Sequence, residues 1–99
     1  MKTLTIALAA LVLGFANLAV AGDAAAGKEK SAPCVACHGE DGIGTQGTYP
    51  NLKGQKEEYL VSSTKAYKDG SRSNDMMKMF VMKLTDEDIA DLAAYYASL

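Results

Sequence analysis

The chain has 99 residues, enough for one domain, and twelve acidic against ten basic side chains give it a formal net charge of −2 at pH 7. Nucleic-acid recognition depends on clustered basic residues, so this balance argues against a nucleic-acid partner. Two cysteines and one histidine are too few for a structural zinc site, which takes four such ligands, unless a carboxylate completes the set.

The first 21 residues are typical of an export signal. Lys2 makes the start positive, residues 4–18 are almost wholly apolar, and Ala19-Val20-Ala21 has the small-x-small pattern of a cleavage site. The alternative is an uncleaved anchor, because an apolar run of about 18 residues can just span a bilayer. We expect a signal peptide that is removed, a single mature domain over residues 22–99 that does not span a membrane, and a location in the periplasm.

Residues 22–30 are predicted to form a helix with Asp23 at or near its N-cap, because good helix formers follow it. Pro33 is expected to end or kink this helix just before the cysteines. Glycine inside a helix reduces its stability, so Gly27 is expected to allow another element to approach closely.

Cys34 and Cys37 are two residues apart and His38 follows directly, which is the spacing of c-type haem attachment. Each thiol can add across one vinyl group of the porphyrin, and the adjacent imidazole can then reach the iron. A thioredoxin-like redox dithiol would follow a strand, whereas the preceding residues are Ala-rich and helical. A plain disulfide is the other alternative in an oxidising compartment. The motif predicts one haem c, attached covalently through both cysteines.

Residues 39–54 are predicted to be a loop, because five glycines, Asp41 and Pro50 fall within them. Residues 42–47 match G-x-G-x-x-G. That pattern binds a dinucleotide only where it follows a strand and opens a helix, and neither is expected here. A nucleotide site is therefore rejected.

Residues 55–68 are predicted to form a second helix that Gly70 ends. One face of it carries Tyr59, Leu60, Ser63, Thr64 and Tyr67. A tyrosine stripe of this kind is interpreted as core packing.

Residues 71–83 are expected to form a loop opposite the haem motif, and they contain four of the five methionines: Met76, Met77, Met79 and Met82. Adaptable core filling explains most of them. Iron bound by His38 has one further axial position, and the chain has no second histidine to fill it. A methionine, a lysine, a tyrosine or no ligand are the options, and the cluster favours a thioether, which raises the reduction potential.

Residues 85–99 are predicted to form the last helix, with Thr85 as N-cap, three acidic residues in its first turn and Leu84 placed to contact Ile89. Its apolar stripe consists of Ile89, Leu92, Ala93, Tyr96 and Leu99. No alternation typical of strands is found, so the predicted fold class is all-α.

With these motifs the chain resembles a small bacterial class I cytochrome c of the c553 type, and is similar to one half of a dihaem cytochrome c4. The resemblance covers residues 22–99 and rests on Cys34-x-x-Cys37-His38-Gly39, Tyr49-Pro50-Asn51-Leu52-x-Gly54-Gln55, the methionine segment and residues 84–96. It implies three or more helices wrapped around one haem. It also implies that the first and last helices cross where Gly27 meets Tyr95 or Tyr96.

The resemblance further implies site residues. The carbonyl of Pro50 would accept a hydrogen bond from the far ring nitrogen of His38, which orients the imidazole. The family places the methionine ligand eight residues before the cap of the last helix, which is Met77 here. No proline lies between Met77 and Thr85, unlike the usual pattern, and Met79 is therefore the second candidate.

These features predict an electron carrier and not an enzyme, because both axial positions of the iron would be filled. We expect a soluble monomer that takes electrons from a membrane quinol-oxidising complex or another donor and passes them to a terminal oxidase or peroxidase. One alternative is a pentacoordinate haem gas sensor or small haem enzyme. Another is a fixed electron-transfer subunit of a larger complex.

Overall fold

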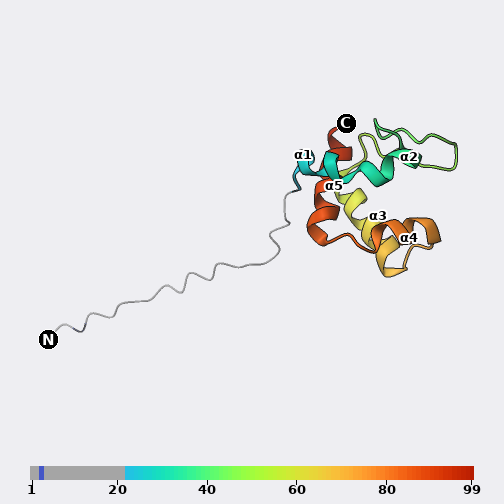
Figure 1. The fold of residues 1–99 in the computed structure, drawn as a ribbon. Helices are drawn as coiled ribbons and strands as arrows, with labels where there is room; N and C mark the ends of the chain where they lie inside the picture. Colours follow the sequence, from blue (N-terminus) through green and yellow to red (C-terminus); the bar gives the residue numbers. More distant parts are fainter. Residues whose placement is uncertain (1–2, 4–21) are drawn as a thin grey trace.

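The computed structural model describes residue 3 and residues 22–99, so the expected signal peptide lies almost wholly outside the described residues. The described residues form α-helices and one short 3-10 helix, without a strand (Figure 1). In chain order these are α1 (Ala24–Lys30), η1 (Ala32–Cys34), α2 (Val35–His38), α3 (Glu57–Asp69), α4 (Asp75–Val81) and α5 (Asp86–Ser98). The predicted all-α class is confirmed. In this part of the chain no helix is both long enough and apolar enough to span a bilayer.

Helix α1 begins as expected, because the Asp23 side chain accepts hydrogen bonds from the backbone N–H groups of Ala25 and Ala26. It ends at Lys30, and Pro33 falls within η1. A proline is tolerated in the first turn of a helix, where its missing N–H is not needed. The expected end of the helix before the cysteines is confirmed, and η1 links α1 to the cysteine motif.

Helices α1 and α5 pack against each other at the buried Gly27 (Figure 1). A Cβ atom built on Gly27 would overlap the carbonyl group of Asp91 and lie 2.8 Å from the Cβ of Tyr95. Only glycine allows the two backbones to come this close. The expected crossing is confirmed, and Tyr95 is the aromatic residue beside it.

Helix α5 begins with a capping box. The Thr85 hydroxyl accepts a hydrogen bond from the Asp88 N–H, and the Asp88 carboxylate accepts one from the Thr85 N–H. Four members of the predicted stripe are buried: Ile89, Leu92, Ala93 and Tyr96. The prediction that Leu99 belongs to this buried stripe was wrong, because Leu99 is 39% exposed and follows the last residue of α5.

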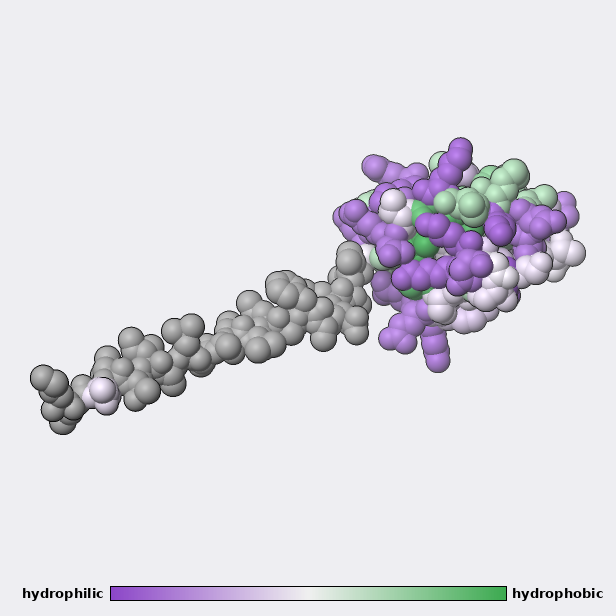
Figure 2. All heavy atoms as spheres, turned by 90° about the horizontal axis from the view of Figure 1, so that it is seen from below, coloured by the Kyte–Doolittle hydropathy of each residue, from purple (hydrophilic) through white to green (hydrophobic). Residues whose placement is uncertain are grey.

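Helix α3 begins at Glu57, two residues later than predicted, and Gly70 ends it in the left-handed region with a φ of 86°. Leu60 of α3 joins a small core with α5 that consists of Leu60, Leu92, Ala93, Tyr95 and Tyr96. Hydrophilic side chains cover much of the face seen in Figure 2. Because this core is small, much of the inward-facing surface of the helices lines a cavity instead.

The prediction of a loop over residues 71–83 was wrong, because Asp75–Val81 form α4. The Asn74 side chain caps this helix by accepting a hydrogen bond from the Met77 N–H at 3.0 Å. Asp75 in the first turn and Lys78 in the last complement the helix dipole. Without a proline in the segment, nothing prevents these helix-forming residues from completing two turns.

Candidate functional site

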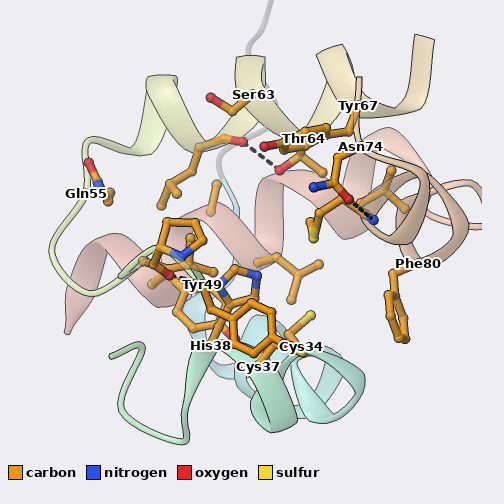
Figure 3. A pocket seen from close by; sticks show the side chains of 18 of the residues that line it. Cys34, Cys37, His38, Tyr49, Gln55, Ser63, Thr64, Tyr67, Asn74 and Phe80 are labelled. Atoms are coloured by element: carbon orange, nitrogen blue, oxygen red, sulfur yellow. Dashed lines mark hydrogen bonds between the residues drawn. The ribbon is translucent and has the colours of Figure 1, made fainter. Parts of the chain in front are cut away.

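A cavity of about 680 Å³ lies between the cysteine motif and helices α3, α4 and α5. In Figure 3 Cys34, Cys37 and His38 lie on one side of it, and the α3 residues Ser63, Thr64 and Tyr67 lie on the opposite side. The volume is within the range of small-molecule and cofactor sites. Both predicted attachment cysteines and the predicted ligand His38 therefore border the same cavity.

The two cysteines are brought together by local structure. Cys34 ends η1, and Cys37 lies in the single turn of α2, so the two side chains are three helical positions apart and share a face. Both thiols are free and partly buried. Burial raises the pKa of the Cys34 thiol, and the nearby Tyr96 hydroxyl opposes this.

His38 is buried, with 6% of its surface exposed, and its Nδ1 lies 2.9 Å from the carbonyl oxygen of Pro50. A carbonyl can only accept, so Nδ1 carries the proton and donates it. The other ring nitrogen, Nε2, then has its lone pair available for a metal. The structure thus places Pro50 where it fixes both the orientation and the tautomer of His38.

The loop after α2 holds Pro50 in place. The carbonyl of Gly42 accepts hydrogen bonds from the N–H groups of Leu52 and Lys53, and the Gly44 N–H donates to the Asn51 side chain at 2.8 Å. Gly42 has a φ of 79°, which other residues rarely adopt. These glycines serve a tight loop that follows α2, and the next helix, α3, begins only at Glu57, so residues 42–47 do not connect a strand to a helix.

The methionines differ in their relation to the cavity. Met77 is partly buried and lines it, and Met76 lines it while being 52% exposed. Met79 is 65% exposed and is not among the lining residues, and Met82 also lies outside the lining. Of the two ligand candidates, only Met77 borders the same space as His38.

The predicted face of α3 lines the cavity with all five of its residues: Tyr59, Leu60, Ser63, Thr64 and Tyr67. The interpretation of the tyrosines as core was wrong. Tyr59 is 49% exposed, and only Leu60 of this face is buried. Leu60 alone reaches the small core with α5, so the tyrosines are left at the cavity wall.

Tyr96 lines the cavity and is 3% exposed, yet within the described residues its hydroxyl has no hydrogen-bond partner. Burial, followed by the charge that Cys34 would carry as a thiolate, raises the pKa of Tyr96 to about 12. Buried hydroxyls are normally hydrogen-bonded. Two free thiols and an imidazole whose Nε2 is available, all on one cavity, fit a covalently bound haem.

Sequence reasoning missed an ion-pair cluster beside the cavity. Lys30 Nζ lies 2.8 Å from Asp88 Oδ1 and 2.6 Å from Asp91 Oδ2. Asp91 is buried and also accepts a hydrogen bond from the Asp23 N–H at 2.8 Å. The bond to Lys30 lowers the pKa of Asp88 to about 2. The cluster joins α1 to α5, and no sequence pattern marked Asp91 as an inward-facing residue.

The chain is similar to a known protein family and to several known proteins. The family model described as cytochrome c matches residues 24–99. Cytochrome c-554(548) of Halomonas halodenitrificans is 57% identical over 81 residues, which cover 79% of this chain and 98% of that protein. Cytochrome c4 of Pseudomonas aeruginosa is 48% identical over 89 residues, 89% of this chain but 44% of that protein.

A solved structure has a similar fold. Reduced recombinant cytochrome c4 from Pseudomonas stutzeri superposes with a TM-score of 0.75 at 40% identity, covering 79% of this chain and 46% of that one. The chain therefore spans about half the length of these cytochromes c4.

Proposed function

The chain belongs to the cytochrome c family, and from this premise we propose that it is a soluble, mono-haem carrier of single electrons between respiratory redox partners in the periplasm. Family membership supports electron transfer by a haem cytochrome, with haem c attached covalently through Cys34 and Cys37. One observation carries the finer proposal. His38 and Met77 border the same cavity as both thiols.

Four side chains would hold the cofactor. Cys34 and Cys37 would supply the thioether links, His38 the proximal ligand through Nε2, and Met77 the distal ligand. The iron supplies a reversible one-electron change when bound. A methionine sulfur favours the ferrous state and so raises the reduction potential, while Pro50 keeps the imidazole oriented.

The two axial positions would both be filled by side chains of this chain, which leaves no iron site for a substrate. This supports a carrier and not an enzyme. As partners we propose a membrane quinol-oxidising complex or another donor, and a terminal oxidase or peroxidase as acceptor. A monomer that docks briefly through a small interface is sufficient for this exchange.

The proposal is tested by the intact mass and the optical spectra of the native protein from a periplasmic extract. The expected mass is that of residues 22–99 plus one haem, and the ferric spectrum should show the weak far-red band of methionine-ligated iron. A ferric protein without that band, whose reduced form binds carbon monoxide readily, would instead be a sensor or small enzyme. Retention of residues 1–21 would contradict export with cleavage.

A further inference from the structure

Arg72 is the single arginine of the chain, and it lines the cavity just after the end of α3. Two α3 tyrosines hold it. Its guanidinium carbon lies 4.8 Å from the centroid of the Tyr67 ring, and its Nη1 lies 3.4 Å from the Tyr59 hydroxyl oxygen. Stacking and hydrogen bonding together restrict the plane of a guanidinium group. Arg72 is therefore oriented at the cavity wall although it is exposed to solvent.

The charge of the cavity wall is unusual for so acidic a chain. The chain has twelve acidic residues, yet none is among the residues that line the cavity. The lining has two permanent cations, and one of them, Lys30, is paired with Asp88 and Asp91. Among the ion pairs of the described chain, none involves Arg72. The cavity thus contains one positive charge that no carboxylate of the described residues compensates.

A carboxylate is the ligand that this arrangement recognises. A guanidinium group offers parallel N–H donors that match the two oxygens of a carboxylate. The Tyr59 hydroxyl adds a further donor, and hydrogen bonds with Ser63 and Arg72 lower the pKa of Tyr59. Haem carries two propionate carboxylates on the edge opposite its vinyl groups. Tyr67 lies across the cavity from Cys34 and Cys37 (Figure 3), so the far edge of a group anchored at the cysteines faces α3.

We propose that Arg72, with the Tyr59 hydroxyl, binds one haem propionate. The inference rests on the proposed function, because it requires haem attached at Cys34 and Cys37. Arg72 then pairs one of the two propionates with a cation at the α3 wall. The other cation of the cavity lining, Lys30, is already paired with Asp88 and Asp91.

The test compares Arg72→Gln with Lys78→Gln, a control that removes an exposed cation of α4 outside the cavity lining. The propionate carboxyls are labelled with carbon-13, and their pKa values are read from the pH dependence of their NMR shifts. Loss of an adjacent cation should raise the pKa of one propionate by about 1 to 3 in Arg72→Gln. The other propionate should be unchanged, as should both in Lys78→Gln. Unchanged titrations in Arg72→Gln would overturn the proposal.

A second variant keeps the test informative if Arg72→Gln does not accumulate as a folded protein. Arg72→Met removes the charge but keeps an unbranched apolar stem of similar length, so the pKa of the same propionate should rise as in Arg72→Gln. The absence of any rise there would also overturn the proposal. The intact mass separates the two hypotheses. A wild-type chain without covalent haem contradicts the proposed function itself, whereas a haem-bearing chain with unshifted variants contradicts only the propionate assignment.

Discussion

His38 donates its Nδ1 proton to the carbonyl oxygen of Pro50 across 2.9 Å, although 12 positions separate the two residues. The bond ties the one-turn helix α2 to the end of the glycine-rich loop. It holds the imidazole with its free nitrogen available to a metal. Another part of the cavity wall belongs to a separate element, α4, which contributes Met77.

Met77→Ala is expected to abolish the far-red band of the ferric protein and to lower the reduction potential, because a thioether ligand is lost. Met79→Ala is the matched control. Met79 lies two positions along the same helix but is 65% exposed and outside the cavity lining, so both properties should be kept. Optical spectra and redox titration measure the two effects, and the reverse outcome would transfer the ligand assignment to Met79.

Asn74→Ala removes the N-cap of α4, the helix that carries Met77. Loss of such a cap costs about 1 kcal/mol, and we expect the variant to lose its far-red band at a lower temperature than the wild type. Ser73→Ala, one residue earlier and outside the helix, should behave as wild type. Thermal melts followed at the far-red band and by circular dichroism decide the point. Equal behaviour of the two variants would show that the cap does not stabilise α4.

Gly27→Ala should destabilise the protein by about 1 to 3 kcal/mol, because the added methyl overlaps the Asp91 carbonyl in a closely packed contact. Gly47→Ala is the matched control, since a Cβ there has no neighbour within 4 Å. It should change the free energy of unfolding by less than about 0.5 kcal/mol. Urea unfolding measures both variants, and a neutral Gly27→Ala would contradict the close approach of α1 and α5.

The ion pairs of Lys30 predict a specific loss of stability in acid. The pKa of Asp88 is lowered from 3.8 to about 2, mainly by the hydrogen bond from Lys30, and the pKa of Asp91 is also lowered, first by the Asp23 N–H. A carboxylate with a depressed folded-state pKa stabilises the fold above its unfolded value and loses that contribution as pH falls through the folded value. Stability should therefore decline between about pH 4 and pH 2.

Lys30→Met should reduce this decline and lower the stability at pH 7, because Asp91 then remains buried without its cation. Lys28→Met removes a lysine of the same helix that is in no ion pair of the described residues, so its acid dependence should match the wild type. Urea unfolding at pH 7, 4 and 2.5 provides the comparison. An acid profile of Lys30→Met identical to that of Lys28→Met would argue against the cluster.

Much of the fold follows from local sequence chemistry. Asp23 and Thr85 cap the helices that they were expected to cap, and Gly70 ends α3, because each acts on the backbone within a few residues. Helix α4 was not predicted, since it has only seven residues, too few for a periodic apolar pattern to be distinguished from a loop.

The site was predictable where its residues are adjacent in sequence. Cys34, Cys37 and His38 have a fixed spacing, and η1 together with α2 places them on one wall of the cavity. The wall that contains Arg72 could not be predicted, because Arg72 contacts Tyr59 only when α3 and the turn after it are folded together. The burial of Asp91 could not be predicted either, because its partner Lys30 is 61 positions away in the sequence.

The 61 positions between Lys30 and Asp91 affect the order in which the elements of the domain fold together. The contact of α1 with α5 joins the two ends of the described domain, so closing it requires a loop that includes nearly every other element. A chain that still lacks its last helix cannot form this contact, nor the core to which Leu92 and Tyr96 belong. The domain is thus expected to close only once residues 86–99 are available, and the part of the cavity wall that Leu92, Ala93 and Tyr96 form is completed in the same step.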